Sequence, residues 1–204
     1  MRAKQFGLLM LSLSLAASGA ACVPCKHPLS DEKTSKVDER LIGEWRFYDG
    51  DKPDADADPL FVGRVKGRDT ALEVVQSGID KEGHVIVERI LLYATKIGSL
   101  QMISMPRQEV KEDRETVYDV VLYDMPDKDT VNWYVMDDQL IGAAIEKKEL
   151  PGTVKSRNIL RTTRYSEASI TASPVELRKF IEKTGKKCFS SELDTTMKRV
   201  PTKQ

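Results

Sequence analysis

The amino-acid sequence predicts a mainly β (α+β) domain, an antiparallel meander that forms a curved sheet or closes into a barrel and carries two short helices. Short segments rich in β-branched and aromatic residues follow one another from residue 41 to residue 136, and polar turns such as Lys81-Glu82-Gly83 separate them. In residues 131–136, apolar Val131, Trp133 and Val135 fall on one face, as expected of a strand. Short connections favour antiparallel pairing, because parallel strands need long crossovers.

Composition narrows the class of protein. The chain has 204 residues, of which 40% are hydrophobic and 31% are charged, so it contains enough apolar material for one packed domain. Lys and Arg number 32, as do Asp and Glu. Proteins that bind nucleic acid carry a basic excess or a basic stripe. We therefore expect no nucleic-acid partner.

The first 21 residues predict an exported protein. Arg2 and Lys4 give a positive start, residues 6–15 are largely apolar, and residues 16–21 are small. This is the order of regions in a secretory signal peptide, and the apolar part is shorter than the roughly 20 residues of a membrane span. We expect residues 1–21 to be removed and the remaining chain to lie outside the cytoplasm.

Gly19-Ala20-Ala21-Cys22 resembles the lipobox of bacterial lipoproteins, in which small residues precede a cysteine that receives a diacylglycerol. The resemblance implies lipid attachment at Cys22 and a cell-envelope protein anchored to a membrane by lipid. Gly19 stands where the pattern usually has Leu. Ser18-Gly19-Ala20 also suits an ordinary signal peptidase, so free export is the alternative.

Two further cysteines remain once Cys22 is assigned to lipid. Cys25 and Cys188 form a disulfide or stay free thiols, and the sequence leaves both outcomes open. The C-x-x-C spacing of Cys22 and Cys25 lies in a proline-containing arm without the βαβ setting of a redox motif. Lys26 interrupts the C-x-x-C-H pattern of covalent haem attachment. We expect no cofactor.

The mature chain divides into two parts. Residues 22–38 are polar and contain two prolines, which predicts a flexible tether. Residues 39–204 then form a single β-rich globular domain. The expected strands cover residues 41–48, 60–66, 72–77, 85–94, 100–105, 117–123, 131–136 and 195–200.

Two helices are expected late in the chain. Residues 138–150 carry an apolar stripe, and Pro151-Gly152 ends the segment. Ser173-Pro174-Val175-Glu176 is a capping box with proline at the first helical position. Gly185 is the expected end of this second helix.

Gly43-Glu44-Trp45 resembles the G-x-W motif that opens the first strand of lipocalins. In that family the tryptophan plugs the closed end of an eight-stranded barrel and an arginine packs over it, a role that the resemblance assigns to Arg199. The family's middle T-D-Y motif is absent, and the helices are placed differently, so a core tryptophan in an ordinary strand is the alternative. The order from residue 41 to residue 200, with Ile170-Thr171-Ala172-Ser173 before the capped helix, also looks like a group of uncharacterised bacterial lipoproteins.

No catalytic residues are assigned. The two histidines, His27 and His84, have no partner recognisable by spacing, and the sequence contains no nucleophile elbow, zinc-protease or phosphate-loop motif. The leading hypothesis is a non-catalytic binding or structural domain, whose partner is a small apolar ligand or an envelope protein. The alternative is an envelope hydrolase whose paired carboxylates no linear motif reveals.

An acidic loop is the weak candidate for a metal site. Asp54, Asp56 and Asp58 alternate as at the start of a calcium-binding loop. Pro59 stands in place of the turn glycine, and Val65 in place of the bidentate glutamate. We expect a solvated loop and no metal.

Overall fold

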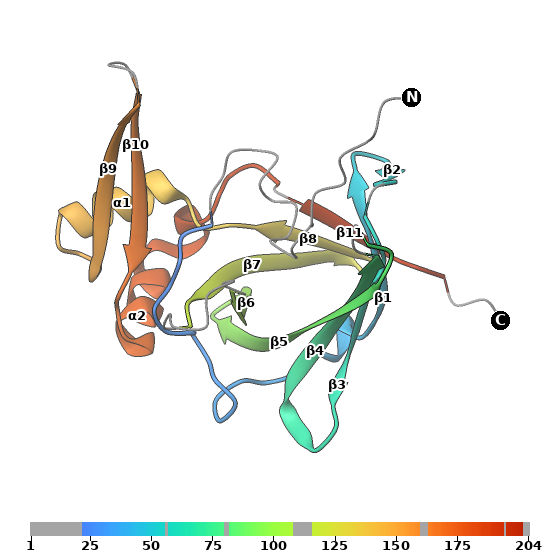
Figure 1. The fold of residues 1–204 in the computed structure, drawn as a ribbon. Coiled ribbons are helices and arrows are strands. Elements are labelled where there is room, and N and C mark those ends of the chain that lie inside the picture. The colour runs from blue at the N-terminus through green and yellow to red at the C-terminus, as the bar shows by residue number, and fades with distance from the viewer. Residues whose placement is uncertain are drawn as a thin grey trace.

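The computed structural model of the protein describes residues 22–55, 57–79, 82–107, 116–159, 163–193 and 195–201. The predicted signal peptide lies outside these ranges. The described chain forms a closed antiparallel barrel of eight strands with two short α-helices, which confirms the predicted fold class (Figure 1). The barrel strands are β1 (Gly43–Asp49), β3 (Leu60–Val65), β4 (Arg68–Ile79), β5 (Val85–Ile97), β6 (Leu100–Pro106), β7 (Tyr118–Asp127), β8 (Thr130–Tyr134) and β11 (Thr195–Arg199).

Each barrel strand pairs with its neighbours in an up-and-down order. The sheet runs β11-β8-β7-β6-β5-β4-β3-β1, and β11 pairs in turn with β1, where Trp45 lies opposite Arg199. This last pairing removes the free edges that an open sheet would expose. The two-residue strand β2 (Lys52–Pro53) extends the pairing of β1 beyond the barrel.

The chain between β8 and β11 forms a separate group of elements beside the barrel (Figure 1). It contains α1 (Asp138–Glu146), the hairpin of β9 (Gly152–Ile159) and β10 (Thr163–Ile170), α2 (Pro174–Thr184) and the 3-10 turn η3 (Gly185–Cys188). The capping box predicted at Ser173 and Glu176 is formed in both directions. Helix α1 ends at Glu146, earlier than predicted, and Lys148 then takes a left-handed φ of 59° that no continuing helix allows.

Two apolar cores lie on opposite faces of the barrel wall. The barrel core is inside and comprises Leu41, Trp45, Leu60, Val62, Leu72, Val74, Ile90, Leu92, Ile103, Val121, Tyr123, Val131, Trp133, Val135 and Met197. The outer core lies between the wall and the helices and comprises Val23, Cys25, Leu29, Ile97, Met102, Val120, Leu122, Met136, Ile141, Ala144, Leu150, Ala168, Ile170, Ala172, Leu177, Phe180, Ile181, Cys188 and Phe189.

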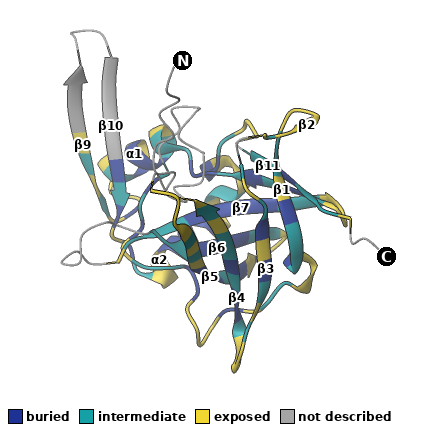
Figure 2. Cartoon of the chain, turned by 45° about the vertical axis from the view of Figure 1, so that its right-hand side comes forward, coloured by how far each residue is buried: buried dark blue, intermediate teal, exposed yellow. Residues whose placement is uncertain are grey.

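Strand β7 shows how one wall serves both cores. Val121 and Tyr123 belong to the barrel core, whereas Val120 and Leu122 belong to the outer core. Side chains of a strand alternate between its two faces, so a strand that is covered on both sides reads as an unbroken apolar run. Figure 2 shows these buried positions along β7, in contrast to the exposed strand β2.

The N-terminal arm, residues 22–38, differs from the flexible tether that the sequence predicts. Val23, Cys25 and Leu29 are at most 3% exposed and belong to the outer core. The Cys25 amide donates to the Tyr118 carbonyl at 2.8 Å, and the Tyr118 amide donates back to Cys25 at 2.8 Å. The Leu29 amide donates to Ser104 Oγ at 2.9 Å. Spaced apolar side chains thus hold a polar segment against the barrel wall, and the tether prediction is wrong for these residues.

The barrel cavity as candidate binding site

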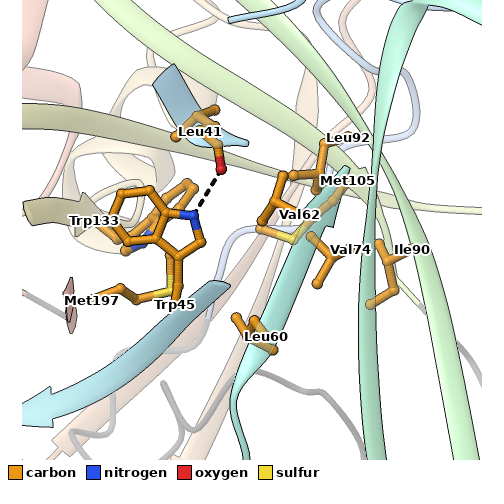
Figure 3. Close-up of a pocket in the computed structure, with 10 residues that line it drawn as sticks. All are labelled: Leu41, Trp45, Leu60, Val62, Val74, Ile90, Leu92, Met105, Trp133 and Met197. Carbon is orange, nitrogen blue, oxygen red and sulfur yellow. Dashed lines mark hydrogen bonds between the residues drawn. The ribbon is translucent and has the colours of Figure 1, made fainter. Parts of the chain in front are cut away.

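An apolar cavity of about 40 Å³ lies inside the barrel. Its lining side chains come from the 3-10 turn η2 (Glu39–Leu41) and from every barrel strand except β7 (Figure 3). They are Leu41, Trp45, Leu60, Val62, Val74, Ile90, Leu92, Met105, Trp133 and Met197. Of these, only the two indoles carry an N–H group, and neither nitrogen contributes to the surface of the cavity, which is wholly apolar.

The first tryptophan closes one end of the barrel. Trp45 is fully buried, and its Nε1 donates to the Leu41 carbonyl at 2.7 Å (Figure 3). The Arg199 guanidinium lies 4.3 Å from the centroid of the Trp45 ring. Arg199 also donates to the carbonyls of Ile42 at 2.6 Å and Arg40 at 2.7 Å. The cation therefore covers the aromatic face and satisfies the backbone of the segment that crosses the barrel end.

Gly43 makes this close approach sterically feasible. Its φ is 148°, a backbone conformation that side-chain-bearing residues rarely adopt. A Cβ atom at this position would overlap Arg199 Nη1. The structure thus brings together Gly43, Trp45 and Arg199, the three residues that the lipocalin resemblance singled out.

A hydrogen-bonded network holds η2 over the same end. The Tyr123 hydroxyl donates to Asp38 Oδ2 at 2.8 Å, and Arg40 Nε donates to Asp38 Oδ1 at 2.9 Å. Burial opposes ionisation of Asp38, but the hydrogen bonds from Arg40 and Tyr123 outweigh it and lower the pKa of Asp38. Burial and the bond to Asp38 raise the pKa of Tyr123 well above its usual range. Tyr123 therefore stays a protonated donor at neutral pH.

The second tryptophan differs from Trp45 in the hydrogen bonding of its indole N–H. Trp133 lines the cavity from β8, and its Nε1 is the one buried side-chain nitrogen or oxygen without a hydrogen-bond partner among the described residues. Its ring packs against Tyr123, with a distance of 5.6 Å between centroids. An unsatisfied buried N–H costs about 1–3 kcal/mol relative to a paired one. The sequence placed Trp133 on the inward face but gave no signal of this unpaired donor.

Cys22, the predicted lipid attachment site, lies at the other end of the barrel. Its side chain is half-buried and packs against the barrel core, and its carbonyl accepts from Arg107 Nη2 at 2.9 Å. Arg107 directly follows β6, and it forms an ion pair with Asp119 of β7. Because neighbouring strands alternate in direction, the end of β6 lies opposite the Trp45 end, which is where β1 begins.

The disulfide considered for Cys25 and Cys188 is not formed. Both are buried free thiols, and Cys188 Sγ donates to the Gly185 carbonyl at 3.1 Å. Burial raises the pKa of Cys188 to about 12 and places the pKa of Cys25 higher still. Since the thiolate is the reactive form, both side chains act as small apolar groups of the outer core.

The acidic loop does not gather into a metal site in the described part of the chain, where no group of three or more His, Cys, Asp or Glu side chains has the geometry to hold an ion. Asp54 and Asp58 are described, and Asp56 lies outside the described residues. The Asp54 amide donates to the Phe47 carbonyl at 2.9 Å, so this part of the loop folds back on β1.

Neither histidine lines the barrel cavity. His84 is exposed, and its Nδ1 lies 3.5 Å from Glu82. His27 is half-buried in the N-terminal arm.

The described carboxyl groups with a shifted pKa all have a pKa below its usual value. This is expected of ionised groups that accept hydrogen bonds, rather than of acids kept protonated for catalysis. They are Asp31, Asp38, Asp127 and Glu176.

Comparison with known proteins gives no relative: no family model, no curated protein and no solved structure matches the chain. The resemblances to lipocalins and to bacterial lipoproteins therefore stay predictions that depend on short motifs. Within the described residues, no helix is long and apolar enough to cross a membrane.

Proposed function

We propose that this protein is exported, is anchored to a membrane of the cell envelope by lipid on Cys22, and binds a small apolar ligand inside its barrel without catalysing a reaction. The cavity in the barrel core carries the binding part of this proposal. Its ten lining residues are apolar or aromatic, and none is charged. Sites for small molecules are mostly apolar and contain few polar groups that set specificity.

An apolar ligand can make stabilising contacts with these side chains that water cannot make. Atoms that line a void lose dispersion contacts on one side, and an apolar ligand restores them. A cavity of about 40 Å³ is large enough for water, but water needs two to four polar partners to be stable inside a protein. Each methylene group that moves from water into such a site contributes about 0.8 kcal/mol. The site therefore favours narrow alkyl groups over polar ones.

The position of Cys22 supports the link between anchor and ligand. Cys22 packs against the barrel core at the end opposite Trp45. A lipid on this residue would hold that end of the barrel beside the membrane, which is itself the main store of alkyl chains in a cell envelope.

The lipid is tested by replacing Cys22 with Ser in the protein made in its own host. We expect the wild-type chain to partition into detergent and the Cys22→Ser chain to appear in the aqueous phase or unprocessed. Cys188→Ser is the matched control, because it also removes a thiol but should leave partitioning unchanged. An intact mass equal to an unmodified chain that starts at Ala21 or Cys22 contradicts lipid attachment and supports free export.

The ligand is tested by native mass spectrometry of the protein from its host. We expect bound apolar molecules at a fixed stoichiometry, and a large loss of them in Leu92→Phe, which fills the cavity from β5. Leu177→Met changes the outer core instead and should keep the bound molecules. A wild-type protein that carries no ligand and gains no thermal stability from an added alkane contradicts the binding proposal.

A further inference from the structure

Charge is distributed unevenly along the chain, although the positive and negative totals are equal. Residues 22–146 contain 16 Lys and Arg against 26 Asp and Glu. Residues 147–159 and 163–187, called the basic group below, contain ten Lys and Arg against four Glu, a net charge of +6. The basic group comprises β9, β10, α2 and most of η3, which lie together beside the barrel (Figure 1). The fold therefore separates a basic part of the molecule from an acidic part.

Several lysines of the basic group are exposed and lack a counter-charge. Lys147 and Lys148 directly follow α1, and Lys155 lies in β9. All three are exposed, and none forms an ion pair within the described part of the chain. Lys183 Nζ lies 3.4 Å from Glu149, which brings α2 beside the turn that carries Lys147 and Lys148. Positive charges that are gathered in this way create a local potential that attracts anions.

The N-terminal arm joins the basic group to the predicted site of lipid attachment. The amide of Ile170, the last residue of β10, donates to the Pro24 carbonyl at 2.9 Å, and the Lys26 amide donates to the Ile170 carbonyl at 2.8 Å. Cys22 precedes Pro24 by two residues, which span at most about 7 Å. A lipid on Cys22 would therefore hold the basic group close to the headgroups, at a range where salt screens charge only in part.

Resting on the proposed lipid at Cys22, we propose that the basic group binds anionic phospholipid headgroups and thereby orients the barrel on the membrane. An anionic surface attracts the basic group and repels the acidic residues 22–146, so both parts of the molecule favour the same orientation. Each cation close to such a surface strengthens binding about fivefold. A lipid fixes the position of one residue only. The basic group supplies the second contact that selects which side of the protein faces the bilayer.

A second copy of the chain is the other surface that offers negative charge. Its carboxylates are partly engaged within their own chain, since Asp38 accepts from Arg40, Asp119 pairs with Arg107, and Asp124 accepts from the Tyr134 hydroxyl. Phosphates of a bilayer have no such partners and lie in a dense layer beside the anchor. The membrane is therefore the occupant that charge and position favour.

The experiment measures how the processed Cys22→Ser chain, which carries no lipid, binds to sedimented vesicles. We expect vesicles that contain phosphatidylglycerol to bind it at least about tenfold more tightly than vesicles of phosphatidylcholine alone. Salt at about 1 M, where the screening length is about 3 Å, should abolish this preference. The double variant Lys147→Glu, Lys148→Glu should bind the anionic vesicles at least about tenfold more weakly than the parent chain.

A matched control separates the location of the charge from its amount. Lys66 and Lys128 are exposed in the β3–β4 and β7–β8 turns, at the Trp45 end of the barrel. The double variant Lys66→Glu, Lys128→Glu changes the net charge by the same amount outside the basic group. We expect it to weaken binding to the anionic vesicles less than about twofold, because these positions lie more than a screening length from the docked surface.

A second measurement uses the wild-type chain from its host and does not depend on the variants being stable. Amide hydrogen exchange between Lys147 and Lys155 should be slower on phosphatidylglycerol vesicles than on phosphatidylcholine vesicles, whereas the turn at Lys66 should exchange equally on both. Equal binding to the two kinds of vesicle, or equal losses in the two double variants, would overturn the proposal.

Two further outcomes identify which idea has failed. A dimer that forms at low salt and is dissociated by Lys147→Glu, Lys148→Glu, together with no preference among vesicles, would overturn the membrane contact and assign the basic group to a second copy. A wild-type mass without lipid on Cys22 would contradict the proposed anchor. The preference of the unlipidated chain for phosphatidylglycerol is measured independently of that mass, so the two proposals fail separately.

Discussion

The barrel core and the outer core contain the same kinds of side chain but differ in how completely they are filled. In the outer core, the N-terminal arm, both helices and one face of β7 meet, and Cys25, Ile141, Ile170 and Leu177 are all fully buried. The barrel core encloses a cavity and an unpaired indole N–H. Protein interiors normally pack as densely as organic crystals. The outer core is therefore the more completely packed of the two. The barrel core leaves space unfilled, which lowers its contribution to the stability of the fold.

The largest effect should come from truncating a leucine in each core. Leu177→Ala removes a side chain that is in contact on all sides, and we expect it to lower the free energy of unfolding by about 3–5 kcal/mol. Leu92 borders the cavity and already lacks contacts on one side, so Leu92→Ala should cost about 2–3 kcal/mol. Urea denaturation of both variants measures the difference. Equal losses would remove the distinction between a filled and an unfilled core.

The closed end of the barrel should be sensitive to substitution, with a smaller loss than in the outer core. Gly43→Ala forces a positive φ on a residue with a Cβ and pushes Arg199 off the Trp45 ring, so we expect a loss of about 2–3 kcal/mol. In an Arg199→Met background the same substitution has no guanidinium to displace and should cost less. This double-mutant cycle, measured by thermal unfolding, isolates the Gly43–Arg199 contact. Additive losses would show that the two residues act independently.

Adding a methylene group is the opposite change to truncation. It should also destabilise the outer core more than the barrel core. Val120→Leu overpacks the outer core and should cost about 1–2 kcal/mol. Val74→Leu extends into the cavity, where the added group finds space, so its effect on the free energy of unfolding should be less than about 1 kcal/mol. The same variant should weaken the binding of an added alkane such as octane. A Val74→Leu protein as destabilised as Val120→Leu would mean that the cavity is closed in solution.

The smallest effect concerns acid. Because the pKa of Asp38 is lower in the folded protein than in the unfolded chain, its contribution to stability is complete above about pH 4 and is lost as the pH falls through the folded pKa. Asp38→Asn should cost about 1 kcal/mol at neutral pH and almost nothing once Asp38 is protonated. Chemical denaturation of both proteins across this pH range tests the sign. A penalty that grows on acidification would contradict the assigned network of Asp38, Arg40 and Tyr123.

Much of the barrel follows from local sequence pattern. The apolar, β-branched segments predicted the strands, and the alternation of Val131, Trp133 and Val135 placed all three in the barrel core, as the structure confirms. The capping box fixed the start of α2 from four residues. These features depend on contacts between neighbours in the chain or on a period of two, which a single sequence displays directly.

Other features depend on contacts that no local pattern records. The hairpin β9–β10 carries polar and charged residues such as Lys155 and Arg164, without the alternation that marks a strand. Val23, Cys25 and Leu29 are isolated within a polar segment, so composition predicts a tether even though each has a place in the outer core. Among the described residues, no acceptor lies within hydrogen-bond distance of Trp133 Nε1. The sequence therefore predicted the barrel interior but not this unpaired donor beside it.

The packed arm sets the reach of the protein. A flexible tether of the length of residues 22–38 would let a domain range about 20–25 Å on average from its anchor. Here Cys22 is joined to Arg107 by a hydrogen bond, and Val23 is already buried in the outer core. Residues 22–38 therefore do not act as a flexible spacer between the lipid and the barrel. A lipid on Cys22 would thus confine the barrel to a thin layer at the bilayer surface. Its search for a ligand would run in two dimensions, with the Cys22 end of the barrel moving along the membrane surface.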